Sequence, residues 1–177
     1  MSTASLPPGY REISAHRVRE VVGPGYHDLA EGLVIEHRPG RTITDTDNTL
    51  ITTLSGNTAP IHLDAHYAAQ TPWRRILVCS GVTLTYVAGM TVRATSGLTP
   101  ANLGLDDVRF EHPVFVGDTL YAETEVIGRR LSKSRPGEGI VTCRTVGLNQ
   151  DNERVVAFTR TFLVPTDPAA VRGPAHY

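Results

Sequence analysis

Cysteine is scarce in this sequence, with two residues among 177. Cys79 and Cys143 both lie among apolar and β-branched residues, which favours buried, inert thiols over a disulfide or a metal-binding pair. A glycine-rich phosphate-binding loop is also absent, because Gly23-Pro24-Gly25 lacks the strand and helix that such a loop joins. The sequence therefore predicts neither a metal nor another cofactor.

An excess of one charge is missing as well. The chain carries 17 Lys+Arg and 18 Asp+Glu, for a net charge of −1, so no surface for nucleic acid or for a membrane is indicated. The longest apolar-leaning stretch, residues 76–94, is interrupted by serine, glycine and threonine and carries Arg93, which excludes a membrane span. Residues 1–10 lack the basic region and apolar core of a signal peptide. We expect a cytoplasmic protein.

What is present is the composition of one globular domain. Hydrophobic residues make up 40% of the chain and charged residues 20%, and 177 residues suffice for one sizeable core. Proline and glycine gather near both ends. We therefore expect a flexible or surface-draped arm over residues 1–27, a folded domain over 28–165, and an unstructured tail over 166–177.

The first half of the domain predicts a strand and two short helices. Residues 33–41 are short, partly alternating and contain Pro-Gly near their end, which is typical of an edge strand. Asp47 is a candidate N-cap for a helix over 48–54. Asp64 is a second candidate N-cap, for a short helix over 65–70 that a proline soon follows.

A third, longer helix begins at Ser80 or Gly81 and reaches about Thr95. It has no charged side chain before Arg93, so we expect other elements to enclose it on all sides. Four β-rich runs follow, and turn sequences at 116–118 and 149–152 suit hairpin connections. The runs are residues 108–116, 119–130, 139–149 and 153–164. This order predicts an α+β fold in which a curved antiparallel sheet wraps one central helix.

The segment Ser55-Gly56-Asn57-Thr58-Ala59-Pro60-Ile61-His62-Leu63-Asp64 is the first place to look for chemistry. Pro60 fixes its own φ and pushes Ala59 towards an extended conformation, so His62 stands on a rigid stretch of backbone. A histidine held in this way can exchange protons near neutral pH.

This motif and the order of elements resemble the hot-dog fold, and within it the MaoC-like (R)-specific enoyl-CoA hydratases and dehydratases, over residues 28–165. Asn57 stands where the family signature, Ser-Gly-Asp-x-Asn-Pro-(Ile/Leu)-His-x-Asp, has its acid, and Ala59 replaces the second Asn. Residues 79–82 stand at the family's Ala-His-Gly-Met block, and 113–120 resemble its strand–turn–strand block. The signature itself is matched at Ser55, Gly56, Pro60, Ile61, His62 and Asp64.

Three further segments, 44–48, 101–104 and 132–137, resemble the subgroup described as mesaconyl-CoA hydratase or β-methylmalyl-CoA dehydratase. That subgroup is similar to this sequence in carrying asparagine at the position of Asn57. The resemblance therefore implies that Asn57 is a subgroup feature.

In the family, an Asp and a His hold a water that adds across the double bond of an enoyl thioester, while a backbone N–H binds the thioester oxygen. The resemblance implies that His62 is the histidine and Gly81 the amide donor. Because Asn57 cannot accept a proton as a carboxylate does, we favour a mechanism in which His62 is base and then acid. The residues expected to touch substrate are Pro60, Ser80, Val82 and Tyr86.

Other readings of the same residues stay open. Asp47 or Asp64 could supply the missing acid, although both are candidate caps. His62-x-Asp64-x-His66 could suggest a metal, but such alternate residues point in different directions. Several basic residues could either contact the phosphates of coenzyme A or be solvated surface charge. These are Arg74, Arg75, Arg129, Arg130, Lys133 and Arg135.

The expected function is hydration or dehydration of a 2-enoyl or 3-hydroxyacyl thioester of coenzyme A or acyl carrier protein, with a short branched or dicarboxylic acyl group. A hot-dog thioesterase is less favoured because residues 81–95 contain no Asp or Glu. A non-catalytic acyl-binding subunit and amine addition to an enoyl thioester are further alternatives. An uncovered edge strand and helix face predict a homodimer or higher homo-oligomer.

Overall fold

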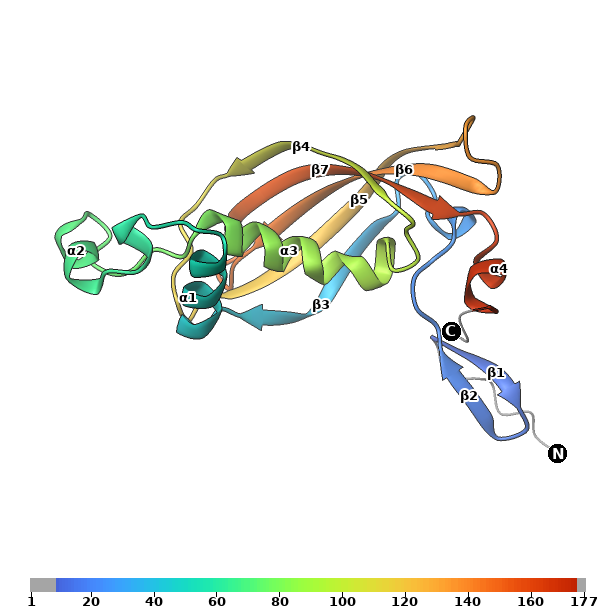
Figure 1. Cartoon of the computed structure of the whole chain (residues 1–177), viewed down its shortest axis with the longest axis horizontal. Coiled ribbons are helices and arrows are strands. Elements are labelled where there is room, and N and C mark those ends of the chain that lie inside the picture. The colour runs from blue at the N-terminus through green and yellow to red at the C-terminus, as the bar shows by residue number, and fades with distance from the viewer. Residues whose placement is uncertain (1–8, 175–177) are drawn as a thin grey trace.

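The computed structural model describes residues 9–174, in which a five-stranded antiparallel sheet curves along one long helix (Figure 1). The strand order is β3-β5-β6-β7-β4, and the helix, α3, spans Ser80–Thr95. The strands are β3 (Val34–Thr42), β4 (Asn102–Phe110), β5 (Thr119–Leu131), β6 (Glu138–Leu148) and β7 (Arg154–Pro165). The predicted α+β arrangement of a curved sheet around a central helix is confirmed.

Both ends of the described chain have more regular structure than we expected. β1 (Tyr10–Ser14) and β2 (Arg17–Glu20) form a separate hairpin, followed by a 3-10 turn, η1 (Tyr26–Asp28). Beyond the sheet, α4 (Pro168–Arg172) begins with proline at its first position and is capped by Asp167. The prediction of an unstructured tail is therefore wrong for residues 168–172, and the arm, which we expected to be flexible or surface-draped, contains a regular hairpin. Residues 1–8 and 175–177 of that arm and tail lie outside the described residues.

The two short helices lie between β3 and α3. α1 (Asp45–Leu54) begins two residues before Asp47, and its N-cap is Thr44 rather than Asp47 as predicted. Asp47 instead completes a capping box, because its Oδ2 accepts from the Thr44 N–H at 2.8 Å. α2 (Ala65–Gln70) begins where predicted, and the Asp64 Oδ1 accepts from the Tyr67 N–H at 2.9 Å.

β4 differs most from the sequence prediction. It covers Asn102–Phe110 rather than 108–116, and it pairs with β7 instead of forming a hairpin with β5. Residues 116–118 therefore lead from the Leu77–Phe115 bridge into β5. The register of β4 shifts in two places, which breaks the alternation that marks a strand. The turn over 149–152 does join β6 to β7, as predicted.

The core lies between α3 and the sheet, and Val87 of α3 fits over Gly147 of β6. A Cβ at Gly147 would lie 2.7 Å from the Val87 Cγ2, so only glycine leaves room for the helix there. The surrounding core side chains include Val82, Leu120, Ala122, Val156 and Phe158. No helix within residues 9–174 is both long and apolar enough to cross a lipid bilayer.

Among the described residues, nothing covers the opposite face of α3. Gly81, Thr85, Gly89 and Val92 follow one another along this face at helical spacing and are all exposed. The prediction that other elements enclose α3 on all sides therefore holds for the side on the sheet and the side towards α1, but not for this face.

Candidate active site

The motif that contains His62 folds back against the segment that precedes α3. After α1 ends, Ala59 is extended, with φ −63° and ψ 121°, and Pro60 begins the 3-10 turn η2 (Pro60–His62). The Leu77 N–H donates to the Ile61 carbonyl at 3.2 Å. This contact joins the motif to residues 77–79, directly before the helix.

His62 is half-buried, and the environment of its ring fixes one tautomer. Its Nδ1 lies 2.8 Å from the carbonyl oxygen of Leu77. Because a carbonyl oxygen only accepts hydrogen bonds, the neutral ring carries its proton on Nδ1 and its lone pair on Nε2. His62 therefore presents a base at Nε2.

Asn57 is half-buried and reaches the same segment. Its Oδ1 accepts from the Ala59 N–H at 3.0 Å, and its Nδ2 lies 3.4 Å from the Cys79 sulfur. Asn57 and His62 are thus both held against residues 77–79, from two neighbouring points on one loop.

Asn48 is a residue of this site that the sequence reading missed. Its side chain is 1% exposed; its Nδ2 donates to the His62 carbonyl at 2.9 Å, and its Oδ1 accepts from the Cys79 N–H at 3.0 Å. Thr52, one turn later, donates to the same oxygen at 3.3 Å. The spacing of Asn48 and Thr52 on one helix face was the only signal in the sequence, and it does not reveal the two distant backbone partners.

The start of α3 offers a backbone donor. Cys79 is the N-cap and makes no side-chain capping bond, and within residues 9–174 no hydrogen bond from the Gly81 N–H is found. Unpaired N–H groups and a partial positive charge gather at such a helix start. A Cβ at Gly81 would meet only the Cys79 sulfur, at 3.8 Å, so packing within the chain does not require glycine there.

The other predicted substrate contacts have different surroundings. Pro60 and Ser80 are exposed. Val82 is 0% exposed and belongs to the core cluster. Tyr86 is half-buried, and its hydroxyl donates to the Asp47 Oδ1. Ser80, Val82 and Tyr86 lie in the N-terminal half of α3. Pro60 lies in the loop that packs against the segment before it.

Asp47 was a candidate for the missing acid, but its carboxylate is ionised and accepts several hydrogen bonds. The hydrogen bond from Tyr86, with further contributions from Thr44 and Arg41, holds the pKa of Asp47 well below its usual range. Burial and the bond to Asp47 raise the pKa of Tyr86. Arg41 also donates to the Asp47 Oδ1, at 3.1 Å. Asp47 therefore acts as a structural anion at the start of α1.

The sequence left a metal site and a second candidate acid open at Asp64 and His66. Both residues are exposed, and Asp64 caps α2. Within residues 9–174, no three His, Cys, Asp or Glu side chains gather in a group that could hold a metal ion.

The six basic residues considered for coenzyme A do not form one cluster. Arg74 and Arg75 lie between α2 and α3, and the Arg75 guanidinium stacks 3.7 Å from the centre of the Phe115 ring. Arg129, Arg130, Lys133 and Arg135 belong to the hairpin between β5 and β6. All six are exposed.

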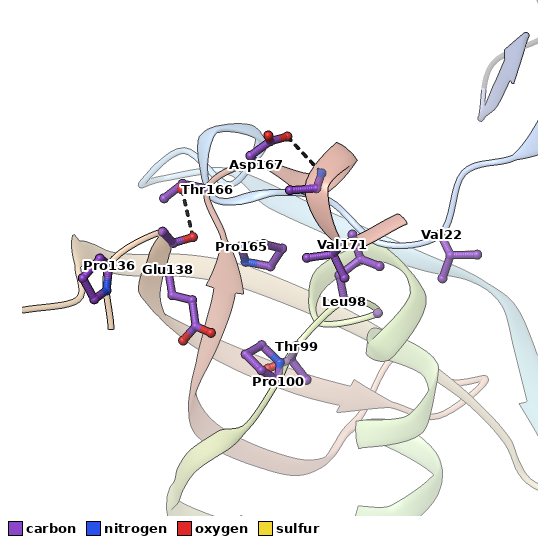
Figure 2. A pocket seen from close by; sticks show the side chains of 13 residues that line it. Val22, Leu98, Thr99, Pro100, Pro136, Glu138, Pro165, Thr166, Asp167 and Val171 are labelled. Carbon is purple, nitrogen blue, oxygen red and sulfur yellow. Dashed lines mark hydrogen bonds between the residues drawn. The ribbon is translucent and has the colours of Figure 1, made fainter. Parts of the chain in front are cut away.

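One cavity lies away from His62, beyond the C-terminal end of α3 (Figure 2). It measures about 570 Å³ and is lined largely by apolar residues, among them Leu98, Pro165 and Val171. None of the predicted site residues lines it. At the candidate site itself, Ser80 and Gly81 are exposed and His62 is half-buried.

Comparison with known proteins places this geometry in a family. Residues 29–147 match the MaoC like domain family. Mesaconyl-CoA hydratase of Haloarcula marismortui is 32% identical over 155 residues, which cover 86% of this chain and 43% of that protein. Beta-methylmalyl-CoA dehydratase of Chloroflexus aurantiacus is 34% identical over 149 residues, covering 84% and 42%.

The fold is shared with solved structures. A Mycobacterium tuberculosis protein described as having a double hotdog fold aligns with a TM-score of 0.75 and 28% identity, over 82% of this chain and 45% of that one. The chain thus spans less than half the length of these relatives. The predicted hot-dog fold is confirmed, and this chain belongs to the MaoC like domain family.

Proposed function

We propose that this protein hydrates the double bond of a 2-enoyl thioester, or dehydrates the corresponding 3-hydroxyacyl thioester. The observation that carries the proposal is the 2.8 Å contact between the His62 Nδ1 and the Leu77 carbonyl. It leaves Nε2 free to take a proton, beside a helix start whose Gly81 N–H is available to an oxygen.

His62 and Gly81 have complementary tasks in this reaction. In hydration, Nε2 removes a proton from water as the water oxygen bonds to C3 of the thioester. The double-bond electrons move through C2 onto the thioester oxygen, and the Gly81 N–H stabilises the negative charge there. The imidazolium then returns its proton to C2. Dehydration is the same sequence reversed.

Asn57 orients the water in this proposal and does not remove a proton. Its amide has donors and an acceptor but no basic atom, and it lies beside the Cys79 end of the same segment. A single histidine then serves both proton transfers.

A second copy of the chain is the proposed cover for an edge strand and a helix face. Within residues 9–174, the outer edge of β4 has no partner strand. Its residues Leu103, Leu105 and Phe110 are exposed, and so is the adjacent face of α3. Two sheets joined at such an edge bury both features at once. The double hotdog relative, more than twice the length matched here, supports a pair of units. A homodimer is therefore the proposed assembly.

The proposed substrate is a coenzyme A thioester with a short branched or dicarboxylic acyl group. Support comes from the names of two relatives, mesaconyl-CoA hydratase and beta-methylmalyl-CoA dehydratase. The proposed location is the cytoplasm, because Cys79 and Cys143 are free and buried, which suits a reducing compartment.

The test is a panel of enoyl-CoA substrates followed by the loss of conjugated thioester absorbance. We expect the wild-type protein to hydrate at least one substrate and His62→Ala to abolish the reaction. His66→Ala, which changes an exposed histidine nearby, serves as the matched control. An unaffected His62→Ala would sink the proposal, and so would release of free thiol without loss of the double bond, which would indicate a thioesterase.

A further inference from the structure

Arg160 of β7 is a buried cation without an acidic partner. It is 7% exposed, and it forms no ion pair within residues 9–174. The neighbouring titratable groups do not balance its charge. Burial lowers the pKa of His37 to about 4, with help from Arg160, and burial raises the pKa of Cys143 to about 11. Both are neutral at pH 7.

Three hydroxyl groups hold one side of the Arg160 guanidinium. Its Nη2 donates to Thr91 at 3.2 Å, to Thr95 at 2.9 Å and to Ser96 at 2.9 Å. Thr91 and Thr95 donate their own protons to α3 carbonyls at 2.7 Å each, so their oxygens are turned towards the cation. The hydroxyls orient Arg160 but leave its charge unneutralised, a costly arrangement in a protein interior.

A cavity adjoins this cation. It measures about 340 Å³, lies between α3 and the edge strand β4, and is lined by Arg160. The other residues around it carry no charge: Ala88, Asn102, Leu103, Gly104 and Leu105. Because the three hydroxyls occupy Nη2, the charged hydrogen bond to a carboxylate comes from the rest of the guanidinium. The cavity therefore suits a ligand group that carries a negative charge next to Arg160 and is neutral elsewhere.

The anion cannot be the far end of a short acyl group bound at Gly81 of the same chain. The guanidinium lies beside Thr91 and Thr95, which places it about 15 to 21 Å along the helix from Gly81 at 1.5 Å per residue. The two carboxyl carbons of a four- or five-carbon dicarboxylic acid are roughly 4 to 5 Å apart. A short acyl group bound at Gly81 therefore does not reach Arg160 of the same chain.

In a dimer joined at β4, the two places come from different copies of the chain. α3 runs from Val87, near Val156, to Thr91 and Thr95, near Arg160, and so follows the direction of β7. β4 runs the opposite way, from Asn102 opposite Phe162 to Phe110 opposite Val156. Pairing of two β4 edges about a two-fold axis therefore lays each α3 antiparallel to its copy. The start of one helix then lies towards the Arg160 end of the other.

We propose that Arg160 of one protomer binds the distal carboxylate of an acyl group held at His62 and Gly81 of its partner. The idea rests on the proposed hydratase function and adds the residue that selects dicarboxylic over monocarboxylic acyl groups. Arg160 then belongs to a composite site that a single chain lacks.

The test compares two thioesters, mesaconyl-CoA, whose acyl group ends in a carboxylate, and crotonyl-CoA, whose acyl group ends in a methyl. Arg160→Gln should lower kcat/KM for mesaconyl-CoA by about 10- to 100-fold, the usual worth of a charged hydrogen bond, and leave that for crotonyl-CoA unchanged. Arg144→Gln, which changes an exposed arginine on β6, should affect neither. Equal losses with both substrates, or no loss, would overturn the role of Arg160. Wild-type protein that hydrates neither substrate contradicts the hydratase function instead.

A mixing experiment tests which chain supplies Arg160. His62→Ala and Arg160→Gln are co-expressed, and their hybrid dimer is assayed with mesaconyl-CoA. Because the intact His62 of one chain then faces the intact Arg160 of the other, activity should exceed that of either variant alone. No recovery overturns the arrangement between chains. If Arg160→Gln does not fold by circular dichroism, Ala88→Leu, which narrows the cavity and keeps the charge, should give the same selective loss, and unchanged selectivity overturns the proposal.

Discussion

At the scale of single residues, the sequence located the loop and helix start but not the residue that joins them. His62, Asn57 and Gly81 are recognisable because a ten-residue motif and a helix start are local patterns. Asn48 escaped because its function depends on the His62 carbonyl and the Cys79 N–H, which only the folded chain brings together. Local patterns reveal side-chain types, whereas a buried amide that contacts two backbone groups looks like any polar helix residue.

Asn57 provides the sharpest test at this scale. Asn57→Ala should reduce kcat by about 10- to 100-fold, at or below the lower end of general acid–base effects, because the water loses an orienting group while His62 keeps both proton transfers. Single-turnover assays on a substrate that the wild-type protein hydrates would measure this. Thr58→Ala, at the exposed neighbouring position, is the control. Complete loss of turnover in Asn57→Ala would mean that one histidine is not sufficient.

At the scale of elements, the sequence predicted most helices and strands and misplaced those with weak or broken patterns. α2, β5, β6 and β7 were recognised from caps and alternation. β4 was placed several residues too late, because its register shifts interrupt the alternation, whereas the apolar residues after it resemble a strand. α4 was missed although Asp167-Pro168 is a helix-start signal, because a tail rich in proline and glycine favours disorder.

The capping box of α1 makes a prediction with a defined pH dependence. Asp47→Asn should reduce the free energy of unfolding at pH 7 by about 1–2 kcal/mol, because hydrogen bonds to the carboxylate from Thr44 and Tyr86 are weakened. The pKa of Asp47 is lower in the folded protein than in the unfolded chain. Its contribution is therefore full above the pKa of the unfolded chain and is lost as pH falls through the folded pKa.

Urea unfolding at pH 7 and at successively lower pH would follow this effect. The difference between wild type and Asp47→Asn should shrink below about pH 4, the ordinary pKa of an aspartate. Asp45→Asn, on the same first turn, controls for the loss of charge at a helix start. A difference that stayed constant with pH would show that the ionised carboxylate is not the stabilising group.

At the scale of the whole molecule, the sequence predicted the curved sheet around one helix and also an uncovered edge strand and helix face, but it did not show where on the molecule these uncovered parts lie. A helix with apolar residues on nearly every side predicts full enclosure, yet within residues 9–174 α3 packs on one face against the five-stranded sheet and on a second side against α1. Strand order also depends on contacts between distant segments, so the sequence could not show that β4 is an edge. The exposure of Gly81 and that of the outer face of α3 thus have one cause, which is that the sheet covers only the other side of the helix.

Assembly can be tested at the β4 edge. Phe110→Asp places a charge on an exposed position of that edge, and we expect it to turn a dimer into a monomer with greatly reduced hydratase activity. Analytical ultracentrifugation and the enoyl-CoA assay measure the two effects. Leu54→Asp, at an exposed leucine on α1, should change neither. A Phe110→Asp protein that is monomeric and fully active would show that one chain forms a complete site.

The contact between Val87 and Gly147 holds α3 in one position along its axis. Val87 packs where Gly147 has no side chain. A shift of α3 along its axis by one turn, about 5.4 Å, would move Val87 from Gly147 onto a residue that has a Cβ. The space above Gly147 in β6 therefore helps to fix where the start of α3 lies. The position of the Gly81 N–H relative to the His62 ring thus depends in part on a contact six residues further along the helix, on the face that packs against the sheet.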